Sequence, residues 1–186
     1  LGTDPRNLVF VRDLKLANAP IVELVREFEA SFDFVASRGD TLYFTTDLNA
    51  PRGRLVALDM ARAAATPQWL ELVPQSADKL DGADLVGGRF ILGYTKDARS
   101  SVRVHGLDGA FLREVDLPGV GSASGFDGRE GDRETFYSFA SFRQPPTVLR
   151  YDIESGASSV WRAPKLAFDP EQFSTEQVFY RSKDGT

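Results

Sequence analysis

The chain has 186 residues, 42% of them hydrophobic, and a formal net charge of −5 at pH 7. This length is enough for one domain or two small ones. The negative charge and the lack of a basic stripe give no support for nucleic-acid binding. No apolar run reaches about 18 residues, so no membrane span is expected. The lack of cysteine excludes disulfides, thiol catalysis and thiolate metal ligands within these residues.

The chain begins with two predicted strands, at residues 7–14 and 21–26. They are separated by a turn sequence around Pro20. We interpret the pair as the outer half of a sheet whose first strands are missing from the sequence.

A β-hairpin is predicted at residues 42–60. Apolar and aromatic residues alternate with others on both sides of a short polar stretch. In that stretch Pro51 fixes one backbone angle, and Gly53 permits a left-handed residue. A loop this short joins antiparallel strands.

The same hairpin pattern recurs at residues 89–108 and 134–152. In each copy the second strand ends in an apolar residue followed by aspartate. These aspartates lie at 59, 108 and 152, so the copies are 49 and 44 residues apart. A repeat of about 40 to 50 residues with four short strands is typical of a β-propeller.

Each hairpin is flanked by two further predicted strands. The inner strands precede the hairpins, at residues 32–36, 83–86 and 122–126, and the outer strands follow them, at 69–73, 111–117 and 157–161. The predicted fold is therefore all-β: three to four blades of a propeller, each a four-stranded antiparallel sheet. So few blades do not close a ring, which suggests a piece of a longer polypeptide with open edges. An alternating strand and a turn over residues 178–186 are expected to begin a different structure.

The residues show no catalytic motif. The serines between Gly121 and Gly125 lack the glycine spacing of a nucleophile elbow, and no dinucleotide fingerprint is present. His105 is the only histidine, and we interpret it as an ordinary mid-strand residue. The charged stretch 127–134 is interpreted as a solvated turn, because Arg129 occupies a position where a calcium loop needs an acidic ligand. No metal and no cofactor are expected.

Three stretches resemble the β-propeller of the prolyl oligopeptidase family of serine peptidases. They are FEASFDFV at residues 28–35, YFTTDLNAPRGRLVALD at 43–59 and QVFYRSKDGT at 177–186. In that family, a segment like the last one leads from the final blade into an α/β-hydrolase domain. The resemblance implies the later blades of a seven-bladed ring, with a propeller part at residues 1–176 and the connection to the missing domain at 177–186.

The resemblance also implies a function. The propeller would gate a serine oligopeptidase that cuts short peptides after proline, with the hydrolase domain and those peptides as its partners. All three residues of the Ser-Asp-His triad would lie beyond Thr186, so no catalytic residue is expected here and the fragment alone should be inactive. Arg12 lies where the family has a substrate-contacting strand and is the candidate substrate-binding residue. Residues 173–179 would pack at the domain boundary and form part of a hinge.

Two other functions remain open from the residues alone. One is a non-catalytic propeller that binds proteins. The other is a sugar-processing enzyme with paired carboxylates, which the small, mostly uncharged inner strands disfavour. The expected compartment is the cytoplasm, with the bacterial periplasm as the alternative.

Overall fold

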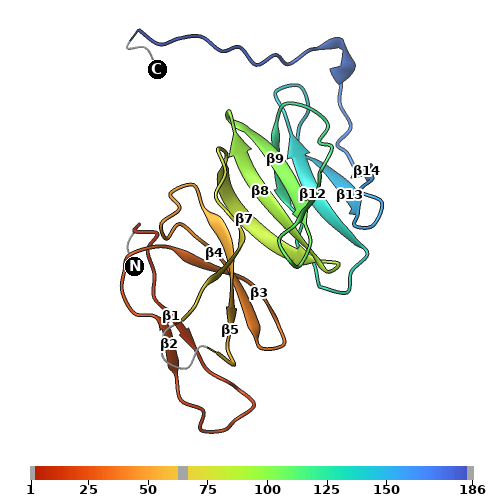
Figure 1. Cartoon of the computed structure of the whole chain (residues 1–186). Coiled ribbons are helices and arrows are strands. Elements are labelled where there is room, and N and C mark those ends of the chain that lie inside the picture. The colour runs from red at the N-terminus through yellow and green to blue at the C-terminus, as the bar shows by residue number, and fades with distance from the viewer. Residues whose placement is uncertain (1–2, 63–66, 184–186) are drawn as a thin grey trace.

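The computed structural model describes residues 3–62 and 67–183, which form fourteen β-strands and one short 3-10 helix, η1 (Pro170–Gln172). β1 (Val9–Val11) and β2 (Val22–Val25) form a two-stranded antiparallel sheet. The other strands form three four-stranded sheets, here called blades A, B and C (Figure 1).

Blade A contains β3 (Phe32–Arg38), β4 (Thr41–Thr46), β5 (Arg54–Asp59) and β6 (Leu70–Val73). Blade B contains β7 (Lys79–Val86), β8 (Arg89–Lys96), β9 (Arg99–His105) and β10 (Phe111–Glu114). Blade C contains β11 (Ser122–Gly125), β12 (Glu134–Ala140), β13 (Thr147–Asp152) and β14 (Ser158–Arg162).

Within each blade, every strand pairs with the next strand in the chain and all pairs are antiparallel. The blades follow one another as an open arc, which confirms the prediction of a partial β-propeller with four-stranded blades (Figure 1). The strands predicted up to residue 161 are all present with shifted ends. The largest shift is in β7, which begins at Lys79 rather than at residue 83.

The blades stack through side chains that alternate along their central strands. On β8, Phe90 packs toward blade A with Tyr43, whereas its neighbour Ile91 packs toward blade C with Tyr137. Consecutive residues of a strand point to opposite faces, so a strand buried on both faces carries an unbroken apolar run. Burying each such side chain contributes about 1.5 to 3 kcal/mol, so the two inter-blade cores hold the arc together.

The recurring aspartate has one structural role in all three blades. A side-chain oxygen accepts a hydrogen bond from a backbone N–H two or three residues further along: Asp59 from Ala61 at 2.9 Å, Asp108 from Ala110 at 3.1 Å and Asp152 from Ser155 at 2.7 Å. Aspartate bonded in this way stabilises a tight turn. The repeat therefore marks the turn that leads from the third to the fourth strand of each blade.

Each blade has an upper and a lower end, which we define by the loops between its strands. The upper end carries the loops between second and third strands, at residues 47–53, 97–98 and 141–146. The lower end carries those between first and second strands, at 39–40, 87–88 and 126–133. The C-terminal segment, residues 163–183, runs over the upper end (Figure 1).

The strand predicted from residue 178 is absent from the described part of the segment. Residues 173–183 form no strand, because no neighbouring backbone in the arc pairs with them. A strand exists only when its N–H and C=O groups find a partner strand. The turn predicted at the end of the chain falls on 184–186, outside the described residues. No helix in the described ranges is long and apolar enough to cross a membrane.

Candidate functional site

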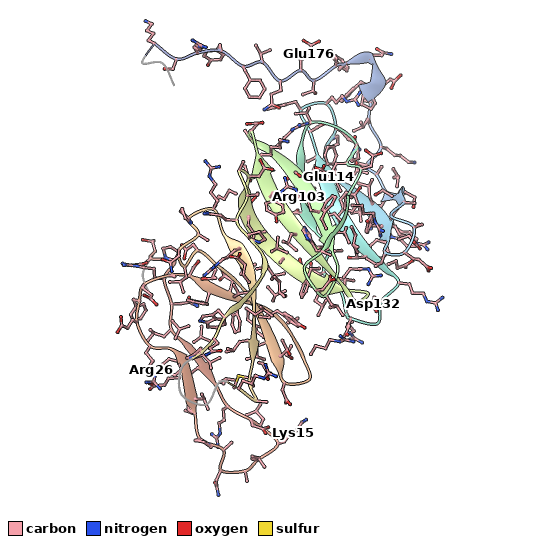
Figure 2. The ribbon with its side chains drawn as sticks, in the orientation of Figure 1. Lys15, Arg26, Arg103, Glu114, Asp132 and Glu176 are labelled. Carbon is pink, nitrogen blue, oxygen red and sulfur yellow. The ribbon has the colours of Figure 1, made fainter. Side chains whose placement is uncertain are left out.

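The upper end of the arc is the candidate functional surface, because the C-terminal segment lies across it. Arg143, in the β12–β13 loop, donates from Nη1 to the carbonyl of Phe173 at 3.3 Å. Gln177 donates from Nε2 to the carbonyl of Asp97 in the β8–β9 turn. The segment thus passes from blade C to blade B, and Figure 2 shows Glu176 beyond the end of the blades.

Past that contact the segment exposes three large side chains in a row. Val178 is 74% exposed, Phe179 72% and Tyr180 88%. Adjacent exposed apolar and aromatic side chains are typical of surfaces that bind another structure. Residues 178–180 are therefore a candidate contact surface.

Two neighbouring hollows lie at this end of the arc. One, of about 450 Å³, is lined by Pro118, Phe139, Ser141, Arg143 and Phe173 among others. The other, of about 490 Å³, is lined mostly by polar groups that include Lys96, Arg99, Glu114 and Asp116. Both hollows share residues 119–120, so they adjoin each other, and the first is also lined by residues 173–175 of the segment.

The groups that line these hollows include polar side chains and one aromatic wall. In the second hollow, Ser101 donates from its hydroxyl to Glu114 at 2.6 Å. A nucleophilic serine needs a base that is itself oriented by a third group, usually a histidine held by a carboxylate. No histidine lines either hollow. These surfaces offer charges, hydroxyls and an aromatic wall to a partner.

The structure places the predicted substrate residue, Arg12, just after β1. It is exposed and donates from Nη2 to the carbonyl of Ala17 at 3.1 Å, within the connection between β1 and β2. The same connection carries Lys15, labelled at the lower edge of the arc in Figure 2. The role of Arg12 in substrate binding stays a prediction.

The only histidine, His105, is buried at the end of a strand and has one ring nitrogen without a partner among the described residues. His105 is the last residue of β9, not a mid-strand one, and is only 5% exposed. Its Nδ1 lies 2.9 Å from the carbonyl oxygen of Gly109, so Nδ1 must carry the proton. Its Nε2 is buried and finds no hydrogen-bond partner among the described residues. Burial lowers the pKa of His105, and the charge of Arg103 adds to that shift.

We expect His105 to make the stability of the chain depend on pH. The unfolded histidine has a pKa near its ordinary 6.5, above the folded value, so below that pH the unfolded state binds more protons. The free energy of unfolding should therefore fall as the pH drops below about 6.5, by at most about 1.4 kcal/mol per pH unit. Urea denaturation at several pH values would measure this slope.

The matched variant is His105→Gln, which cannot titrate in this range. Its unfolding free energy should change less between pH 7.5 and 5.5 than that of the parent chain. Equal pH dependence in the two proteins would show that the buried ring does not control it.

The charged stretch 127–134 lies in the loop between β11 and β12 and ends on the first residue of β12, Glu134, and most of its residues are exposed. It also reaches other blades: Gly87 donates its N–H to the carbonyl of Arg129 at 3.1 Å, and Arg38 pairs with Glu130. Within residues 3–62 and 67–183, no three His, Asp or Glu side chains gather where they could hold a metal ion.

Sequence reasoning did not find the contacts that seat the C-terminal segment. Arg143 and Phe173 are 30 positions apart, and Gln177 and Asp97 are 80 apart. Both bonds end on backbone carbonyls, which every residue carries, so no side-chain pattern announces them. Only the fold brings these atoms together.

Comparison with known proteins gives consistent results. The family model described as "Prolyl oligopeptidase, N-terminal beta-propeller domain" matches residues 1–164. A prolyl endopeptidase of Elizabethkingia miricola is 36% identical over 180 residues, which are 97% of this chain and 25% of that protein. The chain thus spans about a quarter of the length of the curated relatives that it matches.

Solved structures agree with the fold. A chain from a structural study of two prolyl endopeptidases is 42% identical and superimposes with a TM-score of 0.87, over 100% of this chain and 27% of that one. Prolyl oligopeptidase B from Galerina marginata, without ligand, is 26% identical with a TM-score of 0.90, over the same shares of both chains.

Proposed function

Because this chain belongs to the family of prolyl oligopeptidase N-terminal β-propeller domains, we propose that it is part of the gating propeller of a serine oligopeptidase. In this proposal the whole protein hydrolyses short peptides on the carboxyl side of proline. The propeller admits small, flexible peptides and keeps larger chains away from the active site. The observation that carries the proposal is the 36% identity to a prolyl endopeptidase over 97% of this chain.

The C-terminal segment supports a second domain at the upper end of the arc. The relatives are about four times longer than the matched region, so most of their mass lies outside it. The exposed side chains of residues 178–180 need a cover, and the segment leaves the arc at the end where they lie. We assign that cover to an α/β-hydrolase domain, with residues 1–176 in the propeller and 177–186 in the connection. Residues 173–179 then form part of the hinge between the two.

The proposed reaction is acyl transfer from the prolyl carbonyl to a serine and then to water. A Ser-Asp-His triad and an oxyanion hole carry out such a reaction, and all of these groups belong to the hydrolase domain beyond Thr186. The propeller contributes by excluding bulk water and large substrates when the domains are closed. Arg12 is the proposed contact to substrate on the propeller side. The proposed compartment is the cytoplasm, or the periplasm if the source is bacterial.

The test is a cleavage assay on the full-length polypeptide that contains this chain. We expect it to cut a fluorogenic peptide after proline and to leave the matched peptide with alanine in that position largely intact. The efficiency, kcat/KM, should fall as flanking residues are added to the peptide. The isolated chain should cut none of these substrates.

Two results would contradict the proposal. A full-length protein that does not cleave after proline would leave the propeller without the proposed role. Equal efficiency for short peptides and for a folded protein substrate would remove the gating function but keep the peptidase. If Arg12→Ala leaves kcat and KM unchanged for a range of peptides, Arg12 is not a substrate-binding residue.

A further inference from the structure

A further hollow, of about 530 Å³, lies at the lower end of blades B and C and is lined by three arginines. Arg89 is the first residue of β8, Arg113 lies on β10, and Arg133 directly precedes β12. In Figure 2, Asp132, which also lines the hollow, lies at the end of the arc away from Glu176. This hollow is therefore distinct from the two hollows at the upper end.

The guanidinium group of Arg113 is held in place by blade C. Its Nε donates to the hydroxyl of Tyr151 at 2.9 Å, and its Nη2 donates to the carbonyl of Ile153. Gly156 leaves room for this side chain, since a Cβ there would lie 2.7 Å from Nε of Arg113. These bonds leave Nη1 as a further donor. A guanidinium that is already ordered loses little side-chain entropy when it binds a ligand.

The other two arginines have no carboxylate partner in the part of the chain that the structure describes. Arg89 donates from Nη1 only to the carbonyl of its neighbour Gly88, at 3.1 Å. The side chain of Arg133 makes no hydrogen bond or ion pair among the described residues. Its backbone is fixed, because its carbonyl accepts the N–H of Ile153 at 2.9 Å. Both side chains are exposed, so their donors are open to a ligand.

Two carboxylates also line the hollow, and within the described ranges neither pairs with an arginine side chain. Asp132 accepts the backbone N–H of Arg129 with Oδ2, at 2.8 Å, which turns the loop back on itself. Glu154 is exposed and makes no ion pair there. Three arginines against two carboxylates give the hollow a positive excess in a chain whose net charge is −5. A local positive excess of this kind attracts anions.

We propose that this hollow binds the phosphate group of a small phosphomonoester. Three guanidinium groups offer more donors than the two oxygens of a single carboxylate accept, whereas a phosphate group has three strong acceptor oxygens and a charge of about −2 at neutral pH. Leu112 and Ile153 also line the hollow and provide apolar contacts for the organic part of the ester. The volume lies within the range of small-molecule sites, about 300 to 1,000 Å³.

The site goes beyond the proposed function and does not rest on it. All residues that line the hollow belong to blades B and C and their loops, and both blades have four strands in this chain. The hollow therefore requires neither a second domain nor peptidase activity. Binding can be measured whether or not the full-length protein cleaves after proline.

The test is isothermal titration calorimetry of the full-length polypeptide at neutral pH and constant ionic strength, since salt screens exposed charges. The probes are phenyl phosphate, inorganic phosphate and benzoate. We expect phenyl phosphate to bind at least about fivefold more tightly than benzoate, which has the same ring but a single carboxylate. It should also bind more tightly than inorganic phosphate, because its ring can contact Leu112.

Arg89→Gln and Arg133→Gln should each weaken the binding of phenyl phosphate by at least about fivefold, since each removes a charge-assisted donor. Both side chains are exposed, so both variants should unfold at the urea midpoint of the parent protein when no phosphate is present. The matched control is Arg162→Gln. Arg162 is exposed at the end of β14 and does not line the hollow, so its loss removes the same charge and should leave the affinity unchanged.

Three results would overturn the site. Phenyl phosphate that does not bind, or binds no better than benzoate, would show that the arginines do not select phosphate. Affinity that is unchanged in both hollow variants, or that falls equally in Arg162→Gln, would place the binding elsewhere or reduce it to net charge. Equal affinity for phenyl phosphate and inorganic phosphate would exclude the ester and leave free phosphate as the ligand.

Discussion

Replacing Gly109 by alanine is expected to lower the free energy of unfolding by more than about 3 kcal/mol. Gly109 lies in the turn between β9 and β10 and has a φ of +82°, a conformation that costs an L-residue about 1 to 2 kcal/mol. A Cβ there would also lie 2.1 Å from the carbonyl oxygen of Leu72, on the outer strand of blade A. Because that oxygen is backbone, relief requires the blades to move apart. Urea denaturation would measure the loss.

The control for this prediction is Gly88→Ala. Gly88 has a similar φ of +66°, but no atom lies within 4 Å of an added Cβ. The free energy of unfolding of this variant should fall only by the cost of placing an L-residue in the left-handed conformation, about 1 to 2 kcal/mol. The difference between the two variants measures the close approach of blades A and B. Equal losses would show that the Leu72 contact relaxes at no cost.

Replacing Arg113 by alanine is expected to cost about 2 to 3 kcal/mol of stability, since it leaves two acceptors between blades B and C without their donor. Arg113, on β10, donates from Nε to the hydroxyl of Tyr151 at 2.9 Å and from Nη2 to the carbonyl of Ile153. Tyr151 is fully buried, so water does not simply replace the lost bond. The guanidinium of Arg113 also lies 5.9 Å from the centre of the Tyr151 ring.

The companion variant is Tyr151→Phe, which removes one acceptor and keeps the arginine. It should cost about 1 kcal/mol, and the double variant should cost less than the sum of the two single changes. Urea denaturation of all four proteins gives the coupling energy. Strictly additive costs would mean that this bond contributes nothing to the junction.

The junction between blades A and B uses the same device. Arg103 on β9 pairs with Asp78 in the connection between the blades, and its guanidinium lies 4.3 Å from the ring centre of Tyr94. In both junctions one arginine lies beside a buried tyrosine and bonds a connecting segment: Arg113 bonds the backbone carbonyl of Ile153, and Arg103 bonds the Asp78 carboxylate. Planar guanidinium groups suit this role because they donate in several directions and stack on aromatic rings.

Much of this fold could be predicted from the sequence because it depends on local rules. Alternating residues gave the strands, and turn residues such as Gly53 gave their boundaries. The recurring aspartates gave the repeat, since each one stabilises a turn only two or three residues away. Blade number and order follow from this repeat without knowledge of how the blades face one another.

The candidate site was predicted less well, because its contacts depend on distant partners. The strand expected from residue 178 shows the limit: its alternating pattern is present, but a strand also requires a neighbouring backbone, which the arc does not supply. Arg12 was chosen by resemblance, and the structure gives it a bond within its own loop.

The sequence by itself determined the class of fold, the three blades and the family, all through signals that lie within one blade. Only the tertiary structure decided which residues join different blades: Gly109 against Leu72, Arg113 with Tyr151, and Arg38 with Glu130. The physical reason is that these contacts depend on the rotation and spacing between blades. That geometry comes from the whole inter-blade core, so no local pattern of residues encodes it.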